Sequence, residues 1–255
     1  MIVYKYLSPN RASVLEDGLI RFTQSGALND PFETTPNMRK LEQSFRGHAI
    51  RMIEQAELST LDYAIARSKV GSHVKKYLEE FHRNNTNNYA ILSLSKVPNN
   101  LLMWAHYCDS HRGFVLGFDS THRFFQTREF KRFSTLAEVH YSNERPVMPA
   151  PVEWDGSQEQ IEKALSSEDW EYEQELRMIA NPKIADRRVD GVDGHNIYLF
   201  KLPDECLSEV IFGARMLSEE RLQIARLAKN RYPHARLFST ALNQEKFDLD
   251  IVPLA

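Results

Sequence analysis

Residues 169–180, DWEYEQELRMIA, alternate regularly between apolar and charged side chains. The apolar set comprises Trp170, Tyr172, Leu176 and Met178, and the charged set comprises Glu171, Glu173, Glu175 and Arg177. A period of two residues predicts a half-buried strand. Carboxylates two residues apart on one strand face stand roughly 6.5–7 Å apart, so Glu173 and Glu175 could act on one ligand. Two negative charges at that distance raise the pKa of one of the two carboxyl groups. A raised pKa suits a general base or a group that stabilises a cation. The alternative is a solvated strand face that Arg177 neutralises.

The remaining sequence mixes strand and helix patterns. Strand patterns occur at 2–6, 19–22, 89–95, 114–119, 137–141, 197–201, 210–212 and 246–252, and helix patterns at 9–18, 101–111, 158–165 and 218–231. Between 37 and 83, apolar residues recur at helical spacing among charges, which predicts two or three surface helices with a break at Gly71. We therefore expect a single α+β domain over 1–255, with a split, mostly antiparallel sheet and a helical insertion at 37–83.

Composition excludes several classes of protein. The 255 residues are 42% hydrophobic and 11% aromatic, which is enough to bury one sizeable core. With 32 Lys plus Arg against 35 Asp plus Glu, the net charge of −3 provides no overall basic field for nucleic acid or an anionic membrane. No stretch approaches the roughly 20 apolar residues of a membrane span, and the first residues lack the features of a signal peptide.

Cysteine usage and missing motifs narrow the choice further. Cys108 and Cys206 belong to no C-x-x-C pair, which argues against a disulfide framework or a zinc knuckle and fits a reducing compartment. We expect a soluble cytoplasmic protein without a metal cofactor. The H-E-x-x-H, G-x-S-x-G, P-loop and G-x-G-x-x-G motifs do not occur in the sequence. Their absence excludes the common zinc proteases, serine hydrolases, nucleoside triphosphatases and Rossmann enzymes.

Three further segments carry side chains suited to a ligand. Ser93 and Ser95 share one side of a strand end, where hydroxyls can hold a sugar or a phosphate, although such pairs are more often structural. His106 is either a pocket residue or, as we favour, an interior histidine bonded to backbone. The segment 122–133, HRFFQTREFKRF, interleaves basic residues with phenylalanines. It could bind nucleic acid, or form an amphipathic helix with a charged outer face; the basic residues concerned are Arg123, Arg128, Lys131 and Arg132.

Several motifs, taken in order, resemble one known family. They are YKY at 4–6, LNDPFE at 28–33, LSLS followed by LLMWAHYCDSHRGFVLGFD, WEYEQELR at 170–177 and IFG at 211–213. This series resembles the bacterial and phage family catalogued as domain of unknown function 2971, and it extends over nearly the whole chain. The resemblance suggests a family but supplies no activity.

A more distant resemblance does imply an activity. The chain is similar in outline to ADP-ribosyltransferases, which have a first strand with an Arg or His that grips NAD, a helix reading I-L-x-x-G-L, an S-x-S strand followed by a helix, and a last strand with a catalytic Glu, often as E-x-E. Here the corresponding residues are Lys5, SVLEDGLI, Ser93 to Ser95, and Glu173 to Glu175. Lys5 departs from that pattern, which has Arg or His at this position. A lysine can bind phosphate or ribose, but it lacks the paired hydrogen-bond donors of an arginine guanidinium. The resemblance implies the split antiparallel sheet of the ADP-ribosyltransferase fold.

The same resemblance implies a role for each candidate residue, with NAD as substrate. Glu175 would stabilise the oxocarbenium-like state formed when the nicotinamide–ribose bond breaks, and Glu173 would orient or deprotonate the acceptor. The residues that would grip or stack on NAD are Tyr4, Lys5, Ser93, Ser95, Trp104 and Tyr107. The acceptor would be a protein or a nucleic acid, in a toxin or phage-defence setting. We expect Glu175→Gln to remove activity and leave the melting temperature nearly unchanged.

Two other functions are open on the sequence alone. One is a nucleic-acid-binding defence or anti-defence protein that uses residues 122–133 and has no NAD chemistry. The other is a catalytically dead interaction module. That module would hold Trp104, His106 and Trp170 in a closed core, with no pocket beside Glu175.

Overall fold

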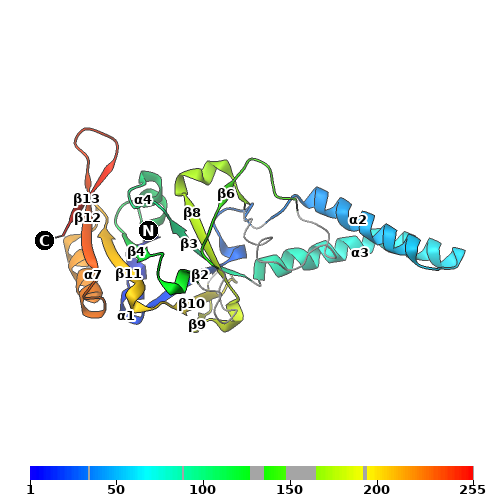
Figure 1. The fold of residues 1–255 in the computed structure, drawn as a ribbon, viewed down its shortest axis with the longest axis horizontal. Helices are drawn as coiled ribbons and strands as arrows, with labels where there is room; N and C mark the ends of the chain where they lie inside the picture. The colour runs from blue at the N-terminus through cyan, green and yellow to red at the C-terminus, as the bar shows by residue number, and fades with distance from the viewer. Residues whose placement is uncertain (34, 88, 127–134, 148–164, 192–193, 255) are drawn as a thin grey trace.

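The computed structural model describes residues 1–33, 35–87, 89–126, 135–147, 165–191 and 194–254. These residues form an α+β fold with a large, mostly antiparallel sheet, which confirms the expected class (Figure 1). The sheet strands are β1 (Ile2–Leu7), β2 (Leu19–Gln24), β3 (Ala90–Ser95), β4 (Phe114–Asp119), β5 (Ala137–Glu138), β8 (Glu175–Ala180), β9 (Arg187–Val189), β10 (Ile197–Lys201), β11 (Leu207–Phe212), β12 (Arg236–Leu242) and β13 (Leu249–Pro253). The helices are α1 (Val14–Asp17), α2 (Met38–Gln55), α3 (Thr60–Asn87), α4 (Leu101–Tyr107), α5 (Arg123–Gln126) and α7 (Ser218–Arg231).

The strand order is β13-β12-β11-β4-β1-β3-β2-β10-β9, with β8 and then β5 added along the other edge of β3. Strands β11 and β12 run parallel, and the other pairs of the described sheet are antiparallel. A separate pair, β6 (His140–Tyr141) and β7 (Leu165–Ser166), lies outside this sheet.

Alternating side chains of the central strands supply two hydrophobic cores, one on each face of the sheet. In β4, Phe114 and Leu116 belong to the larger core, whereas Val115 between them belongs to the smaller core. Helices α1 and α7 close the larger core, and α4 closes the smaller one. Because it is covered on both faces, β4 is an almost continuous apolar run rather than an alternating one.

Strand β3 carries both β1 and β2 on the same edge, at opposite ends. Tyr4 of β1 pairs with Ser95, whereas the last two residues of β2 pair with the first two of β3. Strand β8 occupies the whole of the other edge. Strands β1 and β2 therefore diverge, and the sheet opens between them beside residues 92–94. There the Nζ atom of Lys5 donates a hydrogen bond of 2.9 Å to the backbone oxygen of Ser93.

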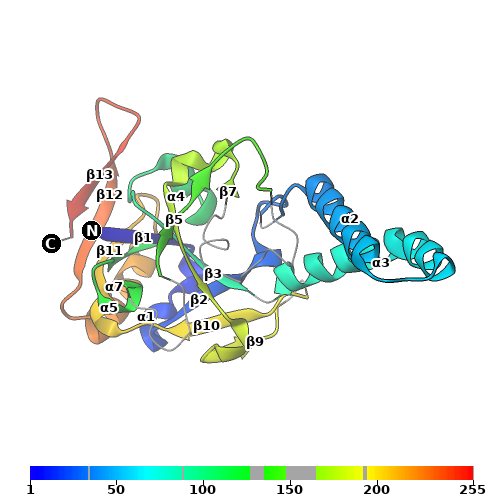
Figure 2. The same cartoon turned by 45° about the vertical axis from the view of Figure 1, so that its right-hand side comes forward.

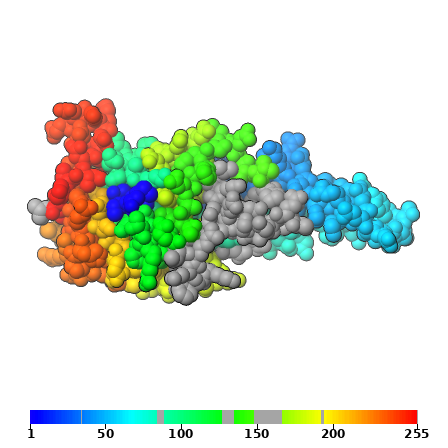
Figure 3. Space-filling model, in the orientation of Figure 1, coloured from blue at the N-terminus to red at the C-terminus, as the bar shows by residue number. Residues whose placement is uncertain are grey.

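Residues 37–83 fall almost entirely within helices α2 and α3, which form a hairpin that projects from the sheet (Figures 1, 2 and 3). Leu41 and Phe45 of α2 and Val70 and Val74 of α3 form a small core of their own. The predicted break at Gly71 is wrong, because α3 continues through it. Space is open where a Cβ of Gly71 would lie, and its neighbour Val70 packs on α2, so tertiary contact outweighs the low helix propensity of glycine.

The predicted strand over 169–180 is wrong in its first half. Residues Glu168–Glu173 form a short 3₁₀ helix, and β8 begins only at Glu175. The backbone changes direction at Gln174, whose φ of 44° lies in the left-handed region. The hydroxyl of Ser167 caps the 3₁₀ helix by accepting from the N–H of Asp169. The face of β8 is not solvated either, because its first four residues are buried.

Other predicted elements agree with the structure to varying degrees. Strand β10 and helix α7 have the predicted bounds. Helix α4 ends at Tyr107 rather than at 111, because three consecutive residues, 109–111, adopt positive φ. Strand β12 was not predicted, since its residues are mostly half-buried and carry no clear alternation.

The predicted helix 158–165 and residues 127–133 lie outside the described residues, apart from Leu165 in β7. Among the described helices, none combines the length and apolarity of a membrane span.

Candidate functional site

The opening of the sheet at β3 holds a pocket of about 260 Å³. Its walls come from β1, β2, β3, the start of β8, one side of α4 and the loop after β2. Polar and aromatic side chains dominate the lining, which includes Tyr4, Lys5, Arg21, Asn29, Glu33, Ser93, Tyr107, Trp170, Glu173, Glu175 and Arg177. Segments that are distant in the sequence therefore meet in one cavity.

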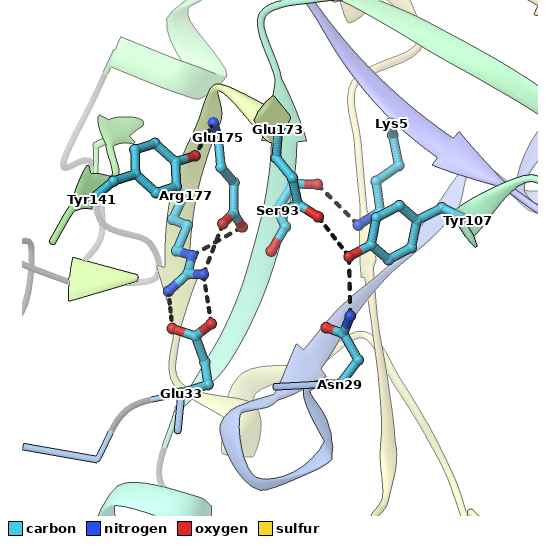
Figure 4. A network of polar contacts seen from close by, with 9 residues as sticks. All are labelled: Lys5, Asn29, Glu33, Ser93, Tyr107, Tyr141, Glu173, Glu175 and Arg177. Carbon is cyan, nitrogen blue, oxygen red and sulfur yellow. Dashed lines mark hydrogen bonds and ion pairs between the residues drawn. The ribbon is translucent and has the colours of Figure 1, made fainter. Parts of the chain in front are cut away.

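A chain of hydrogen bonds ends on the carboxylate of Glu173 (Figure 4). The hydroxyl of Tyr107 donates to Oε1 of Glu173 at 2.6 Å, and Nδ2 of Asn29 donates to that hydroxyl at 3.0 Å. Only 8% of Glu173 is exposed. Burial raises the pKa of Glu173 to about 7, and the charge of Glu175 adds to the rise, whereas the hydrogen bond from Tyr107 opposes it. A carboxyl group with that pKa can take up or release a proton near neutral pH.

Arg177 lies between two carboxylates in the same pocket (Figure 4). Its Nε and Nη2 atoms donate to Glu175 at 2.9 and 2.7 Å, and its Nη1 and Nη2 atoms donate to Glu33 at 2.6 and 3.0 Å. All three side chains are less than a tenth exposed. Burial disfavours the charged guanidinium, but the two carboxylates outweigh this effect and raise the pKa of Arg177. Glu33 thereby ties the loop after β2 to β8.

This ion-pair network corrects one sequence-based expectation. Glu175→Gln leaves the buried Arg177 with Glu33 as its one carboxylate partner in this network. The substitution should therefore lower the stability of the fold as well as the activity. An unchanged melting temperature is therefore no longer expected. Glu173 has no ion pair of this kind among the described residues, and it is the better residue for testing chemistry separately from folding.

Lys5 brings a positive charge to the point where β1 and β2 diverge. Burial lowers the pKa of Lys5 to about 8; the charge of Arg21 lowers it further, whereas the charges of Glu175 and Glu173 oppose the change. The Lys5 ammonium is held by the backbone oxygen of Ser93. In the described part of the chain, the hydroxyl of Ser93 has no hydrogen-bond partner, so it is available to a ligand.

The backbone around Gln174 explains how both carboxylates reach the pocket although only one lies on a strand. The hydroxyl of Ser95 donates to the backbone oxygen of Glu173 at 2.6 Å, and the N–H of Glu175 donates to the hydroxyl of Tyr141 at 2.7 Å. The left-handed residue between them turns Glu173 toward Tyr107, while Glu175 continues into β8.

Most of the predicted site residues are brought together by the fold. Those that line the pocket are Tyr4, Lys5, Ser93, Ser95, Tyr107, Glu173 and Glu175. The hydroxyl of Ser95 is already bonded to backbone, so of the two serines only Ser93 offers a free hydroxyl. The roles assigned to these residues stay predictions.

Trp104 is not in the pocket, contrary to prediction. Helix α4 turns Met103 and Tyr107, four residues apart, toward the cavity and directs Trp104 into the smaller core. There Trp104 packs edge-on against Tyr6, and its Nε1 donates to the backbone oxygen of Pro98 at 2.8 Å. His106 is exposed, so both interpretations of it as a pocket or an interior residue are wrong.

Sequence reasoning missed several pocket residues. Arg177 was considered only as a neutralising charge and Trp170 only as a core residue of an inactive module, and Asn29, Glu33 and Arg21 were not singled out. A signal for two of them was present in the motif LNDPFE, whose polar residues now prove to hold Tyr107 and Arg177. Arg128, Lys131 and Arg132 lie outside the described residues, and Arg123 lies in the short helix α5.

Comparison with known proteins adds one match. Residues 103–178 match the model of a family described as protein of unknown function (DUF2971). This match supports the family resemblance. The DUF2971 match runs from α4 to β8 and includes Tyr107, Glu173, Glu175 and Arg177, whereas Lys5 and Arg21 lie outside it. No curated protein and no solved structure matches the chain. Within the described residues, no group of three His, Cys, Asp or Glu side chains could hold a metal ion.

Proposed function

We propose that this protein cleaves the nicotinamide–ribose bond of NAD and transfers ADP-ribose to a nucleophile on a protein or nucleic acid. The observation that carries the proposal is the buried carboxylate of Glu173, with a pKa near neutrality, in one pocket with Glu175 and the ammonium of Lys5. Paired carboxylates around a glycosidic carbon are the usual means of stabilising and then capturing an oxocarbenium-like state.

The reaction divides between the two carboxylates. As the bond between ribose C1′ and nicotinamide breaks, its electron pair leaves with nicotinamide and positive charge develops on the ribose. Glu175 stabilises that charge, and its position is fixed by Arg177. The acceptor nucleophile then bonds to C1′ and passes its proton to Glu173. Tyr107 and Asn29 hold Glu173 in place for that transfer.

The pocket suits one half of the dinucleotide. Its volume of about 260 Å³ lies just below the ~300–1,000 Å³ of typical ligand pockets, so it encloses nicotinamide and ribose and leaves the adenine half outside. Tyr4, Tyr107 and Trp170 offer aromatic surface to the nicotinamide ring, and the Ser93 hydroxyl offers a hydrogen bond to ribose.

Incubation of the purified protein with NAD tests this proposal. We expect release of free nicotinamide, measured by chromatography, and a mass increase of one ADP-ribose unit on an acceptor. NAD hydrolysis without an acceptor would support bond cleavage alone. Absence of turnover with candidate acceptors, together with absence of NAD binding by calorimetry, would overturn the proposal.

The pH dependence of kcat/KM should be bell-shaped, with its maximum between about pH 7 and 8. Activity rises as Glu173, with its pKa raised to about 7, loses a proton, and falls as Lys5, with its pKa lowered to about 8, loses its charge. Tyr107→Phe removes the hydrogen bond that lowers the pKa of Glu173. The acid limb of the profile should therefore move to higher pH while the alkaline limb stays. An acid limb at the usual carboxyl range in the wild-type protein would contradict this assignment.

The two other functions have weaker support. Nucleic-acid binding through 122–133 stays a prediction, because most of its basic residues lie outside the described part of the chain. A catalytically dead module was expected to have no pocket beside Glu175, and a pocket is present there.

A further inference from the structure

Arg21 lines the pocket and contains an unpartnered polar atom. In β2 the even-numbered residues are buried, whereas Arg21 and Thr23 line the cavity. The Nε atom of Arg21 is inaccessible to solvent and has no hydrogen-bond partner. Buried donors are paired in most proteins, so this unpartnered donor shows that the hydrogen-bonding capacity of a pocket-lining guanidinium is not satisfied within the described residues.

Three carboxylates that line the pocket already have hydrogen-bond partners. Glu33 and Glu175 are both taken by Arg177, and Glu173 is held by Tyr107. Among the described residues, Arg21 makes no ion pair. The pocket thus contains one arginine with two carboxylate partners and a second arginine with none.

Positive charge accumulates around Arg21. Arg11 lies close enough to lower the pKa of Arg21, in addition to the lowering by burial. The charges of Arg21 and Arg11 both act on Lys5 as well. Arg11 also makes no ion pair among the described residues, so neither Arg11 nor Arg21 has a carboxylate partner there. Placing such cations near one another is unfavourable in free energy without an anion. A guanidinium group can donate two parallel hydrogen bonds to the oxygens of a phosphate.

We propose that Arg21 is a binding site for a phosphate group of the ligand that occupies the pocket, and that this ligand carries a diphosphate. The inference goes beyond the proposed function, because it concerns the ligand's phosphates and holds whichever bond is broken. Lys5 lines the same pocket and is within electrostatic range of Arg21 and of both Glu173 and Glu175, so it can interact with the phosphate site and with the site of chemistry.

Calorimetric titration with inorganic pyrophosphate tests this inference in the full chain. We expect the wild-type protein to bind pyrophosphate, and Arg21→Gln to weaken binding roughly 10- to 100-fold, as for loss of charged hydrogen bonds. Arg21→Lys retains the charge but not the fork, so it should give an intermediate affinity. Arg226→Gln, an exposed residue of α7, makes the same change in net charge and should bind like the wild type.

The outcomes separate this inference from the proposed function. Failure of the wild type to bind pyrophosphate, or equal affinity of the wild type and a folded Arg21→Gln variant, would overturn the phosphate site. Equal weakening by Arg226→Gln would show that net charge alone is responsible, and would also overturn it. Pyrophosphate binding without NAD turnover would retain the phosphate site and overturn the NAD chemistry.

Discussion

Arg177→Met should lower the free energy of unfolding by about 3–5 kcal/mol, because it leaves buried carboxylates without their counter-charge. Glu33 and Glu175 accept four hydrogen bonds from this one guanidinium, and both are shielded from water. Chemical denaturation at neutral pH measures the loss. The loop after β2 should also become more accessible to protease, since Glu33 no longer anchors it to β8.

A matched control for this substitution is Arg187→Met. Arg187 pairs with Asp17 at 2.8 Å, but its side chain is 54% exposed, so its loss should cost at most about 1 kcal/mol. Neutralising both partners of Arg177, by adding Glu33→Gln and Glu175→Gln to Arg177→Met, should restore part of the lost stability. A loss below about 1 kcal/mol for Arg177→Met alone would show that the network is not held together as described.

Glu173→Gln should reduce the rate of ADP-ribose transfer to the acceptor by roughly 10²- to 10⁴-fold, the usual effect of removing a general base. The fold should not suffer. The pKa of Glu173 is raised in the folded protein, so stability is lost as the pH rises from the usual carboxyl range to about 7, and the neutral amide avoids that cost. At pH 8, kcat should therefore fall while the melting temperature stays the same or rises.

Glu171→Gln is the control for this change, since Glu171 lies in the same 3₁₀ helix and is exposed. It should retain wild-type activity. Full activity in Glu173→Gln would remove Glu173 from the chemistry, whereas a loss of activity accompanied by unfolding would indicate a structural role.

Local patterns in the sequence were sufficient to predict the class of fold and much of the site. Lys5, Ser93 and the two glutamates were chosen from their positions in strand patterns and from a resemblance, and the pocket contains all four. The strand pattern failed at Gln174 because a single left-handed residue leaves no trace in hydrophobic periodicity. That failure did not remove Glu173 from the site, since the turn directs it to the same cavity.

Pairings between distant residues could not be predicted in this way. The network of Arg177 joins residues 144 positions apart in sequence, and Tyr107 meets Asn29 across 78 positions. Trp104 was misassigned for a related reason: both sides of α4 carry aromatic residues, and only tertiary packing decides that Tyr107 faces the cavity. The position of Arg21 at the pocket likewise depends on how β2 pairs with the start of β3.

The divergence of β1 and β2 along β3 also determines what a ligand must displace. In the described sheet, the strands from β13 to β1 and those from β2 to β9 meet only at β3, and the pocket lies in the interval between the two pairings. A molecule in that interval interrupts no strand pairing of the described sheet, and it lies beside the hydrogen bond from Lys5 to Ser93. Occupation of the pocket is therefore compatible with complete hydrogen bonding between the strands of the described sheet.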